Sequence, residues 1–324
     1  MESIESLRAL NKIKLLSDPR RMEILRRLMA SPATLTQLAQ VLKHSPAWIR
    51  HHIKTLESAG LIELIEVRTT GRVTEKYYRA KASAFLLQQL ILPKTKMPTL
   101  VFSGSHDLAI EEMARRLNKH ILLLSLPVGS LDGLMNLRQG LCQVSGAHLL
   151  DESGEYNTAY VRRFFPDREM EMVTLAHRTQ GLMLSPSNPK RIKRMADLTR
   201  TNVRFVNRNP GSGTRLWFDT ELKKTGGVPA AIHGYDHIVA THTEAASLIE
   251  SGRADAAIGL QAAAHQHGLD FIPLFEERYD LVLPHENEKV ISPILDHIQA
   301  VDFRRSLDSL TGYNTAHSGE IIPI

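Results

Sequence analysis

The stretch Ser45-Pro-Ala-Trp-Ile-Arg-His-His-Ile-Lys-Thr-Leu-Glu-Ser-Ala-Gly-Leu-Ile62 decides the fold of the first part of this 324-residue chain. As a helix, it places Ile49, Ile53 and Leu56 on one face, and its cations lie on the opposite face. Ser45 is a suitable N-cap before a proline, and a glycine ends the helix before an extended stretch. A short helix that carries cations outward and precedes a hairpin is typical of DNA recognition.

Basic residues are concentrated in the first third of the chain. Residues 1–96 contain 17 Lys and Arg against 8 Asp and Glu, a net charge of +9. Residues 97–324 contain 23 against 27, a net charge of −4. The alternative is an ordinary solvated face, but charge and helix pattern together favour nucleic acid as the partner.

The composition excludes several classes of protein. Cys142 is the only cysteine, so no intramolecular disulfide can form. We find no N-terminal signal and no apolar run of transmembrane length, and we therefore expect a cytoplasmic protein. No Gly-x-Ser-x-Gly elbow and no His-Glu-x-x-His spacing occurs, so we expect that the chain is not an enzyme.

Hydrophobic periodicity predicts a mainly helical domain over residues 1–92, with a β-hairpin near its end. The hairpin strands are expected over 61–67 and 73–78, around a glycine-containing loop. The expected helices cover residues 3–16, 19–29 and 35–42, the segment that begins at Ser45, and residues 82–92. This order of elements is a winged helix-turn-helix.

This domain resembles the ArsR-type winged-helix family over about residues 3–92. The resemblance rests on Leu15-Leu-Ser-Asp-Pro-Arg-Arg-Met-Glu-Ile-Leu25, Leu35-Thr-Gln-Leu-Ala39 and His52-Ile-Lys-Thr-Leu-Glu-Ser-Ala-Gly-Leu61. It implies a homodimer, joined through the first and last helices, that reads a pseudo-palindromic operator in double-stranded DNA.

The metal-sensing members of that family carry cysteine thiolates in a helix that here reads Thr36-Gln-Leu-Ala-Gln-Val-Leu42. The absence of cysteine from this helix excludes thiolate sensing. His51 and His52 are adjacent, and adjacent side chains on a helix do not face each other. We therefore predict no metal site.

Positions on the helix that begins at Ser45 predict the DNA contacts. Arg50 is the candidate for bidentate readout of guanine, and His51 faces the DNA whereas His52 packs inward. Trp48 has two interpretations, a DNA contact and half-buried packing. The predicted groove-facing residues are Ser45, Pro46, Ala47, Trp48, Arg50 and His51, and the predicted phosphate contacts are Lys54, Arg68, Arg72 and Lys76.

A polar, proline-punctuated linker over residues 93–98 precedes a second domain over 99–324. Apolar strands alternate there with helices, which predicts a parallel α/β sheet. One expected helix begins at Asn188 and ends near Leu198. Helix N-termini with Ser, Gly or Thr can hold an oxyanion, and four such turns occur: 103–105, 129–130, 212–214 and 241–243.

The second domain resembles the two-lobed, type II periplasmic-binding-protein-like domain, akin to molybdate-binding proteins. The resemblance implies that the chain crosses between the lobes near residues 175–180 and returns near 272–280. The residues that carry it are Phe102-Ser-Gly-Ser-His-Asp107, Gly146-Ala-His-Leu-Leu-Asp151, Asn207-Arg208, Gly211-Ser-Gly-Thr-Arg215, Gly234-Tyr235, Thr241-His242, Gly252-Arg-Ala-Asp-Ala-Ala-Ile-Gly259 and Glu277-Arg-Tyr-Asp280.

The same resemblance implies a tetrahedral oxyanion, molybdate or tungstate, as an effector, and no cofactor. An organic anion or a pterin is the alternative. Arg178 and Arg215 are either charge partners of the anion or partners of a carboxylate such as Asp255. Tyr279 either caps the cleft or packs at the hinge. The candidate ligand residues are Ser103, Ser105, Ser130, Arg178, Ser212, Gly213, Thr214, Arg215, His242 and Tyr279.

Together, these features predict a one-component transcription regulator. Closure of the two lobes on an anion would change the arrangement of paired winged helices, provided that the anion binds two states with different affinity. The rival classes are an enzyme and a cytosolic anion-binding protein with incidental DNA affinity.

Overall fold

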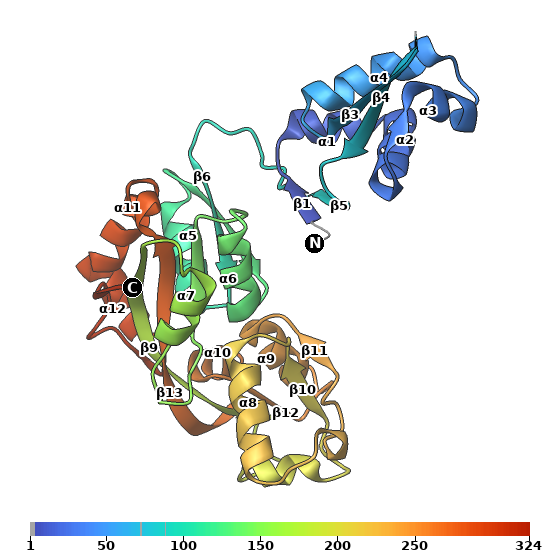
Figure 1. Cartoon of the computed structure of the whole chain (residues 1–324). Helices are drawn as coiled ribbons and strands as arrows, with labels where there is room; N and C mark the ends of the chain where they lie inside the picture. Colours follow the sequence, from blue (N-terminus) through green and yellow to red (C-terminus); the bar gives the residue numbers. More distant parts are fainter. Residues whose placement is uncertain (1–3, 72, 88) are drawn as a thin grey trace. The chain divides into compact units, whose positions relative to one another are not determined.

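The computed structural model describes residues 4–71, 73–87 and 89–324, and it divides into two compact units, Met1–Leu92 and Pro93–Ile324 (Figure 1). Each unit has a buried hydrophobic core of its own. A separate core is the physical basis for a separate domain. Within the described ranges, no helix is both long and apolar enough to span a bilayer.

The first unit is a winged helix-turn-helix. α3 (Leu35–Leu42) and α4 (Pro46–Ser58) form the helix pair, and the hairpin of β3 (Ile62–Thr70) and β4 (Val73–Ala80) forms the wing. The short strand β2 (Ala33–Thr34) pairs with β4 and completes a sheet of order β2-β4-β3. The remaining elements are β1 (Ile4–Leu7), α1 (Leu10–Leu16), α2 (Pro19–Ala30) and β5 (Ala84–Leu87).

Local signals set the ends of the helix pair. Thr34 and Gln37 form a capping box at the start of α3, since each side chain accepts a hydrogen bond from the other residue's backbone N–H. At the start of α4, Ser45 Oγ accepts from the N–H of Trp48 at 3.3 Å. Gly60, with a φ of 71°, lets the chain turn from α4 into the wing.

The two helices predicted at the ends of this unit, over 3–16 and 82–92, need correction. The first is shortened to α1 and preceded by β1, and the second is replaced by β5 and irregular chain. β1 and β5 pair in parallel, with Leu7 opposite Leu87. Both segments have helical periodicity, but propensity is a weak preference that strand pairing overrides.

The second unit is an α/β domain in which one mixed sheet runs through two lobes. The strand order is β11-β10-β12-β9-β13-β8-β6-β7, and β14 and β15 also pair with β9. The first lobe contains β6 (Thr99–Gly104), α5 (Leu108–Leu117), β7 (Leu122–Pro127), α6 (Ser130–Arg138), β8 (Val144–Ala147), α7 (Thr158–Phe164), α11 (Glu288–Gln299), α12 (Val301–Asp308), β14 (Tyr313–Asn314) and β15 (Ile321–Pro323). The second contains β10 (Phe205–Arg208), α8 (Gly213–Lys224), β11 (Ile238–Val239), α9 (His242–Glu250), β12 (Ala256–Leu260) and α10 (Gln261–Gln266).

Two long antiparallel strands, β9 (Met170–Leu184) and β13 (Asp270–Pro284), connect the lobes (Figure 1). β9 pairs with β12 in the second lobe, and β13 pairs with β8 in the first lobe. The predicted crossings near 175–180 and 272–280 fall within these strands. The two-lobed α/β architecture expected from the sequence is therefore confirmed.

The basic helix predicted from Asn188 to Leu198 is wrong. Asn188 has a φ of 41°, and its side chain accepts from Ile192 N at 2.9 Å and donates to Ile192 O at 2.7 Å. A side chain that bonds its own neighbouring backbone favours a turn over a helix. Only a 3-10 helix, Met195–Thr199, forms in this segment.

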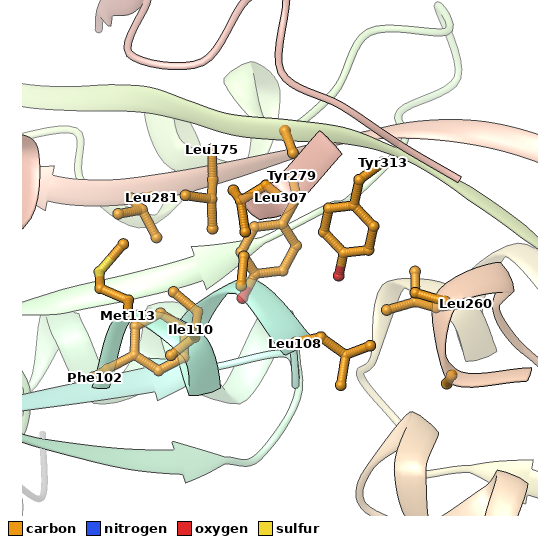
Figure 2. Close-up of a cluster of buried hydrophobic side chains, with 14 of the residues drawn as sticks. Phe102, Leu108, Ile110, Met113, Leu175, Leu260, Tyr279, Leu281, Leu307 and Tyr313 are labelled. Atoms are coloured by element: carbon orange, nitrogen blue, oxygen red, sulfur yellow. The ribbon is translucent and has the colours of Figure 1, made fainter. Parts of the chain in front are cut away.

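Two tyrosines, Tyr279 and Tyr313, lie in the hydrophobic core beside the hinge strands (Figure 2). Tyr279 and Tyr313 are buried among Phe102, Leu108 and other apolar side chains. The hydroxyl of Tyr279 donates to the carbonyl of Ser105 at 2.6 Å. The core thus fixes the loop that follows β6, from which one wall of the cleft begins.

Candidate functional site

The outer face of α4 is cationic and accessible. Ile49, Ile53 and Leu56 are buried in the core of the first unit, which turns the other face outward. The predicted residues on that outward face are all exposed, namely Ser45, Pro46, Ala47, Arg50, His51 and Lys54. The described part of the wing adds Arg68 and Lys76, also exposed, whereas Arg72 lies outside the described residues.

Trp48 and His52 belong to the packing of the helix pair. The ring of Trp48 stacks on His44, with centroids 3.9 Å apart, and meets the edge of His52 at 4.3 Å. His52 is buried, as predicted, and Trp48 is half-buried against the core. Of the two interpretations of Trp48, this geometry supports packing.

A groove of about 590 Å³ lies between α4 and the wing. Its lining includes Pro46, Arg50, Lys54 and Lys76, so four of the predicted DNA contacts share one concave surface. Arg68 lies on the wing, where its guanidinium is bonded to Glu66 at 2.6 Å. A DNA phosphate would have to compete with this carboxylate for Arg68.

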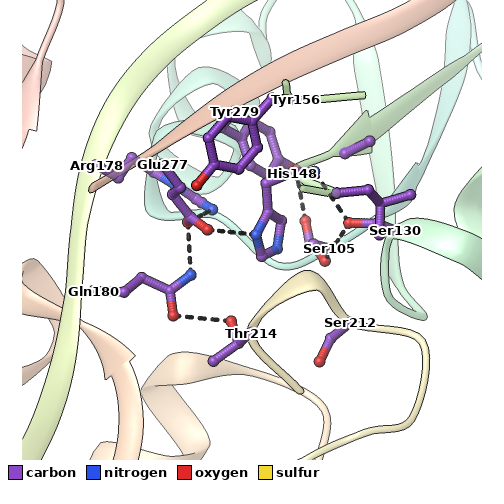
Figure 3. Close-up of polar contacts among 12 residues, drawn as sticks. Ser105, Ser130, His148, Tyr156, Arg178, Gln180, Ser212, Thr214, Glu277 and Tyr279 are labelled. Atoms are coloured by element: carbon purple, nitrogen blue, oxygen red, sulfur yellow. Dashed lines mark hydrogen bonds and ion pairs between the residues drawn. The ribbon is translucent and has the colours of Figure 1, made fainter. Parts of the chain in front are cut away.

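In the second unit, serine and threonine residues face each other across the cleft (Figure 3). Ser105 and Ser130 come from the first lobe, and their hydroxyls are 3.0 Å apart. Ser212, the N-cap of α8, and Thr214 come from the second lobe. All four are buried, and the N–H groups of the first residues of α6 and α8 have no acceptor within their helices.

A buried polar network joins the two lobes at one end of this cleft (Figure 3). Glu277 on β13 accepts from Gln180 at 2.6 Å and from Nδ1 of His148 at 2.5 Å, and it also pairs with Arg178. Thr214 donates to the amide oxygen of Gln180 at 2.9 Å. The first residues of α8 are thereby linked to the hinge.

Several predicted roles change in the structure. Arg178 pairs with Glu277 and with Asp107, so its charge is already neutralised by protein carboxylates. Asp255, suggested as its partner, instead binds Arg204 at 2.8 Å. These contacts assign Arg178 to the hinge rather than to a ligand.

Three more candidates are occupied within the protein. Arg215 pairs with Asp219 at 2.9 Å, so it is not a partner of Asp255. Ser103 accepts from Asn136 at 2.9 Å on the far side of β6. Tyr279 is fully buried in the core, which makes it hinge packing rather than a cap.

Arg208, at the end of β10, is the cation that sequence analysis missed. It is 1% exposed, and Nε and Nη1 have no hydrogen-bond partner among the described residues; Nη2 donates to Ala240 O at 2.8 Å. No carboxylate in the described part of the chain pairs with it. Burial, together with repulsion from Arg178, lowers the pKa of Arg208, although a guanidinium stays protonated at neutral pH. A buried cation without a counter-ion fits an anionic ligand.

His242 is the first residue of α9 and lies near Arg208. Both ring nitrogens are buried without a partner in the described chain, and its backbone N–H donates to Nδ1 of His106 at 3.4 Å. Burial, with repulsion from Arg208, holds the pKa of His242 well below its usual range, so the ring is neutral. Hydrogen-bonding groups without a partner in the described chain therefore lie at the start of α9 and at the carboxyl end of β10.

One other cluster has the composition of a metal site. Ligand atoms of Glu171, His285 and Glu288 lie within 4.8 Å of one another. Nδ1 of His285 is bonded to Glu171 at 2.6 Å, and this hydrogen bond raises the pKa of His285. The imidazole of His285 therefore forms an ion pair with Glu171 at the surface.

Comparison with known proteins gives the family. A family model described as the PBP superfamily domain matches residues 110–299, which is more than half of the chain. The chain belongs to the PBP superfamily. A second model, a helix-turn-helix domain, matches residues 16–65. The chain therefore combines a helix-turn-helix domain with a PBP domain.

A relative matches most of this combined length. The chain is 33% identical over 306 residues to YvgK, an uncharacterised protein of Bacillus subtilis strain 168, covering 90% of this chain and 98% of that protein. Among solved structures, the PBP domain is similar to a tungstate ABC transporter protein from Geobacter sulfurreducens (11% identity, 65% and 98% of the two chains, TM-score 0.45). A phosphate transport receptor from Vibrio cholerae is also similar (14% identity, 66% and 98%, TM-score 0.41).

Substitution of Gly213 tests whether close contact between the two lobes of the PBP domain is needed for anion binding. A Cβ at Gly213 would lie 2.3 Å from the carbonyl oxygen of His148, in the opposite lobe. We expect Gly213→Ala to weaken anion binding by about tenfold or more, because overpacking of this size costs about 1–3 kcal/mol. The measurement is isothermal titration with tungstate or phosphate. Lys223→Ala on the exposed face of α8 is the control, and equal affinities in both variants would contradict the expectation.

The hinge network predicts acid sensitivity of the PBP domain. Burial alone would raise the pKa of Glu277, but Arg178 and His148 hold the pKa of this carboxyl at about 2, well below its ordinary value of 4.5. The unfolded chain therefore takes up this proton first, so the contribution to stability is complete above about pH 4.5 and is lost as the pH falls towards 2. We expect a loss of about 3 kcal/mol from this group, measured by urea unfolding at several pH values. Glu277→Gln should flatten that part of the profile, and an unchanged profile would count against it.

Proposed function

We propose that this chain is a one-component, ligand-responsive transcription regulator. Its winged helix would bind operator DNA as an ArsR-type dimer in the cytoplasm, and its PBP domain would bind a small anion, either an inorganic oxyanion such as molybdate or tungstate or an organic anion. The observation that carries the proposal is the presence, in one chain, of an exposed cationic recognition helix and of a two-lobed domain in which the buried Arg208 has no carboxylate partner among the described residues.

The charges of the first unit support the DNA half of the proposal. Arg50, Lys54 and Lys76 line one groove beside α4, and residues 1–96 carry a net charge of +9. Arg50 lies on the outward face near the start of the helix, where winged-helix proteins contact bases. Lys76 lies on the wing, where a phosphate contact is expected.

Exposed apolar side chains support a dimer. Leu10, Leu86, Leu87 and Ile91 are each more than 45% exposed near the two ends of the first unit. Exposed apolar side chains of this size mark interaction surfaces when they gather in a patch. A second copy of the chain is the partner that a two-fold operator requires.

Helix N-termini and Arg208 support an anion as the effector. Ser130, Gly213 and His242 each begin a helix at the cleft, and a helix N-terminus favours negative charge. Inorganic oxyanions are one class of candidate, and organic anions, including pterins, are the other. We propose binding rather than catalysis, because the sequence contains no Gly-x-Ser-x-Gly elbow and no His-Glu-x-x-His spacing.

Thermal unfolding tests the ligand half. A ligand that binds only the native state raises the unfolding temperature by mass action. The full chain is heated with molybdate, tungstate, phosphate or sulfate, each at several concentrations. A concentration-dependent rise with at least one oxyanion supports the proposal, and its absence for all four would refute binding of an inorganic oxyanion.

Two substitutions test the DNA half. A binding site is first selected from random duplexes with the full chain, and affinity is then measured by fluorescence anisotropy at several salt concentrations. We expect Arg50→Ala to lose about 10- to 100-fold affinity for the selected site and to discriminate less between sequences. We expect Lys76→Ala to weaken binding to all duplexes alike. The slope of log affinity against log salt concentration should become smaller in magnitude by about one. If Arg50→Ala weakened all duplexes equally, Arg50 would be a phosphate contact.

A further inference from the structure

An aromatic groove lies between the two lobes of the PBP domain, beside the buried network of Glu277. It has a volume of about 450 Å³, and its floor is formed by His148, Gly213 and Glu277. A tetrahedral oxyanion is only a few atoms across, whereas pockets for organic molecules have volumes of about 300–1,000 Å³. The groove is therefore far larger than an inorganic oxyanion requires.

The walls of this groove are flat aromatic faces from both lobes and the hinge. Trp217 on α8 stacks on Phe275 of β13, with centroids 3.9 Å apart and planes inclined by 23°. Tyr156 and Tyr160 come from the first lobe and also line the groove. Tyr156 is held in place, because its hydroxyl donates to Glu276 O at 3.0 Å. All four side chains are half-buried, so each leaves part of a ring exposed.

The floor contains a buried polar atom without a partner. Nδ1 of His148 donates to Glu277, since a carboxylate only accepts, and the neutral ring therefore carries a lone pair on Nε2. Nε2 is buried and has no hydrogen-bond partner in the described chain, although the His148 ring lines the groove. Gly213, beside it, is the first residue of α8. A ligand with both a negative group and a hydrogen-bond donor satisfies this floor.

The rim limits the charge of the rest of the ligand. Asp151, Glu152 and Glu221 line it together with Lys224, whose ammonium is paired with Glu221 at 2.7 Å. Negative groups thus outnumber positive ones where the ligand would leave the cleft. A second negative charge on the ligand is disfavoured there.

We infer that the effector is a planar organic anion: one anionic group lies at the N-terminus of α8, and an uncharged aromatic or heteroaromatic body lies against Trp217 and the two tyrosines. This inference rests on the proposed function, because it concerns the same cleft, and it selects the organic class over bare oxyanions. The exposed ring faces supply the affinity that an inorganic ion cannot use.

Matched pairs of probes test the inference. Methyl phosphate and phenyl phosphate, and acetate and benzoate, differ in the aromatic body while the anionic group is kept. Binding to the full chain is measured by titration calorimetry and by quenching of Trp217 in a Trp48→Phe variant, which leaves Trp217 as the only tryptophan. We expect each aromatic probe to bind at least about tenfold more tightly than its partner and to quench Trp217.

Two variants of Trp217 complete the test. Trp217→Leu should remove the preference for the aromatic probe without changing the affinity for methyl phosphate, and Trp217→Phe should restore most of that preference. Equal affinity for both members of each pair, while oxyanions still raise the unfolding temperature, overturns this inference alone. Failure of every probe and every oxyanion to bind overturns the proposed function and this inference with it.

Discussion

Replacement of Arg208 by methionine will abolish the response to anions while leaving the ligand-free protein at least as stable. The guanidinium is buried and has no counter-ion within the described ranges of the chain. Charged hydrogen bonds to a ligand contribute about 1.5–3 kcal/mol each. We therefore expect a fall of about 100-fold in anion affinity. Replacing a buried ionic group by an apolar one of similar size is often neutral or stabilising by about 1–4 kcal/mol, so the unfolding temperature without ligand should be equal or higher.

The control for Arg208 is Arg253→Met, which removes an exposed arginine from the same lobe. It should leave both anion affinity and unfolding temperature unchanged. A clear loss of ligand-free stability in Arg208→Met would show that Arg208 is structural. Unchanged anion affinity would show that the anion lies elsewhere.

Arg178→Met will have the opposite signature, a large loss of stability. Arg178 is fully buried between Asp107 and Glu277, so its removal leaves two carboxylates buried without a cation. Breaking a buried pair in this way costs about 3–5 kcal/mol. For a domain of this size we expect the unfolding temperature to fall by about 6–20 °C, measured by calorimetry.

A double variant separates the ion pair from simple loss of packing. Arg178→Met combined with Glu277→Gln removes one of the stranded carboxylates, so it should regain part of the lost stability. Additive losses from the two substitutions, or a fall of less than about 2 °C for Arg178→Met alone, would mean that the network does not hold the hinge. Anion affinity is not the readout here, because both residues act through the fold.

The sequence does not reveal which of the two buried arginines, Arg178 and Arg208, has carboxylate partners. The partners of Arg178 lie 71 and 99 residues away along the chain, and nothing in local spacing connects them. Arg208 is as deeply buried as Arg178, but no carboxylate among the described residues pairs with it. Its position at the end of a strand, directly before a turn, was the available signal, since ligands of α/β domains bind beyond the carboxyl ends of strands.

Elements with strong local signals were predicted well. α3 and α4 have capping side chains and apolar faces, and Gly60 follows the end of α4; these signals act within one or two turns. The alternation of strands and helices was likewise enough for the two-lobed domain. The helix prediction was wrong for residues 84–87 because this segment pairs with β1. It was wrong for residues 188–198 because the side chain of Asn188 bonds the nearby backbone, which favours a turn.

Side-chain chemistry was harder to predict than the fold. The structure brings Ser105, Ser130 and the α8 turn together, whereas Ser103 bonds Asn136 instead; turns after neighbouring strands of an α/β sheet meet at one edge. The aromatic groove was missed, since Tyr156, Trp217 and Phe275 come from three separate segments. To predict that these three side chains meet, one must know how β9 pairs with β13, and sequence patterns do not specify this register.

The central claim is that an anion in the PBP cleft controls DNA binding by the same chain. The direct measurement is the affinity of the full chain for its selected duplex, by fluorescence anisotropy at fixed salt, with and without phenyl phosphate or tungstate at saturating concentration. The account predicts a change in affinity of at least about fivefold in the wild type and none in Arg208→Met. If saturating anion binds but leaves DNA affinity unchanged, the two sites are not coupled and the account is contradicted.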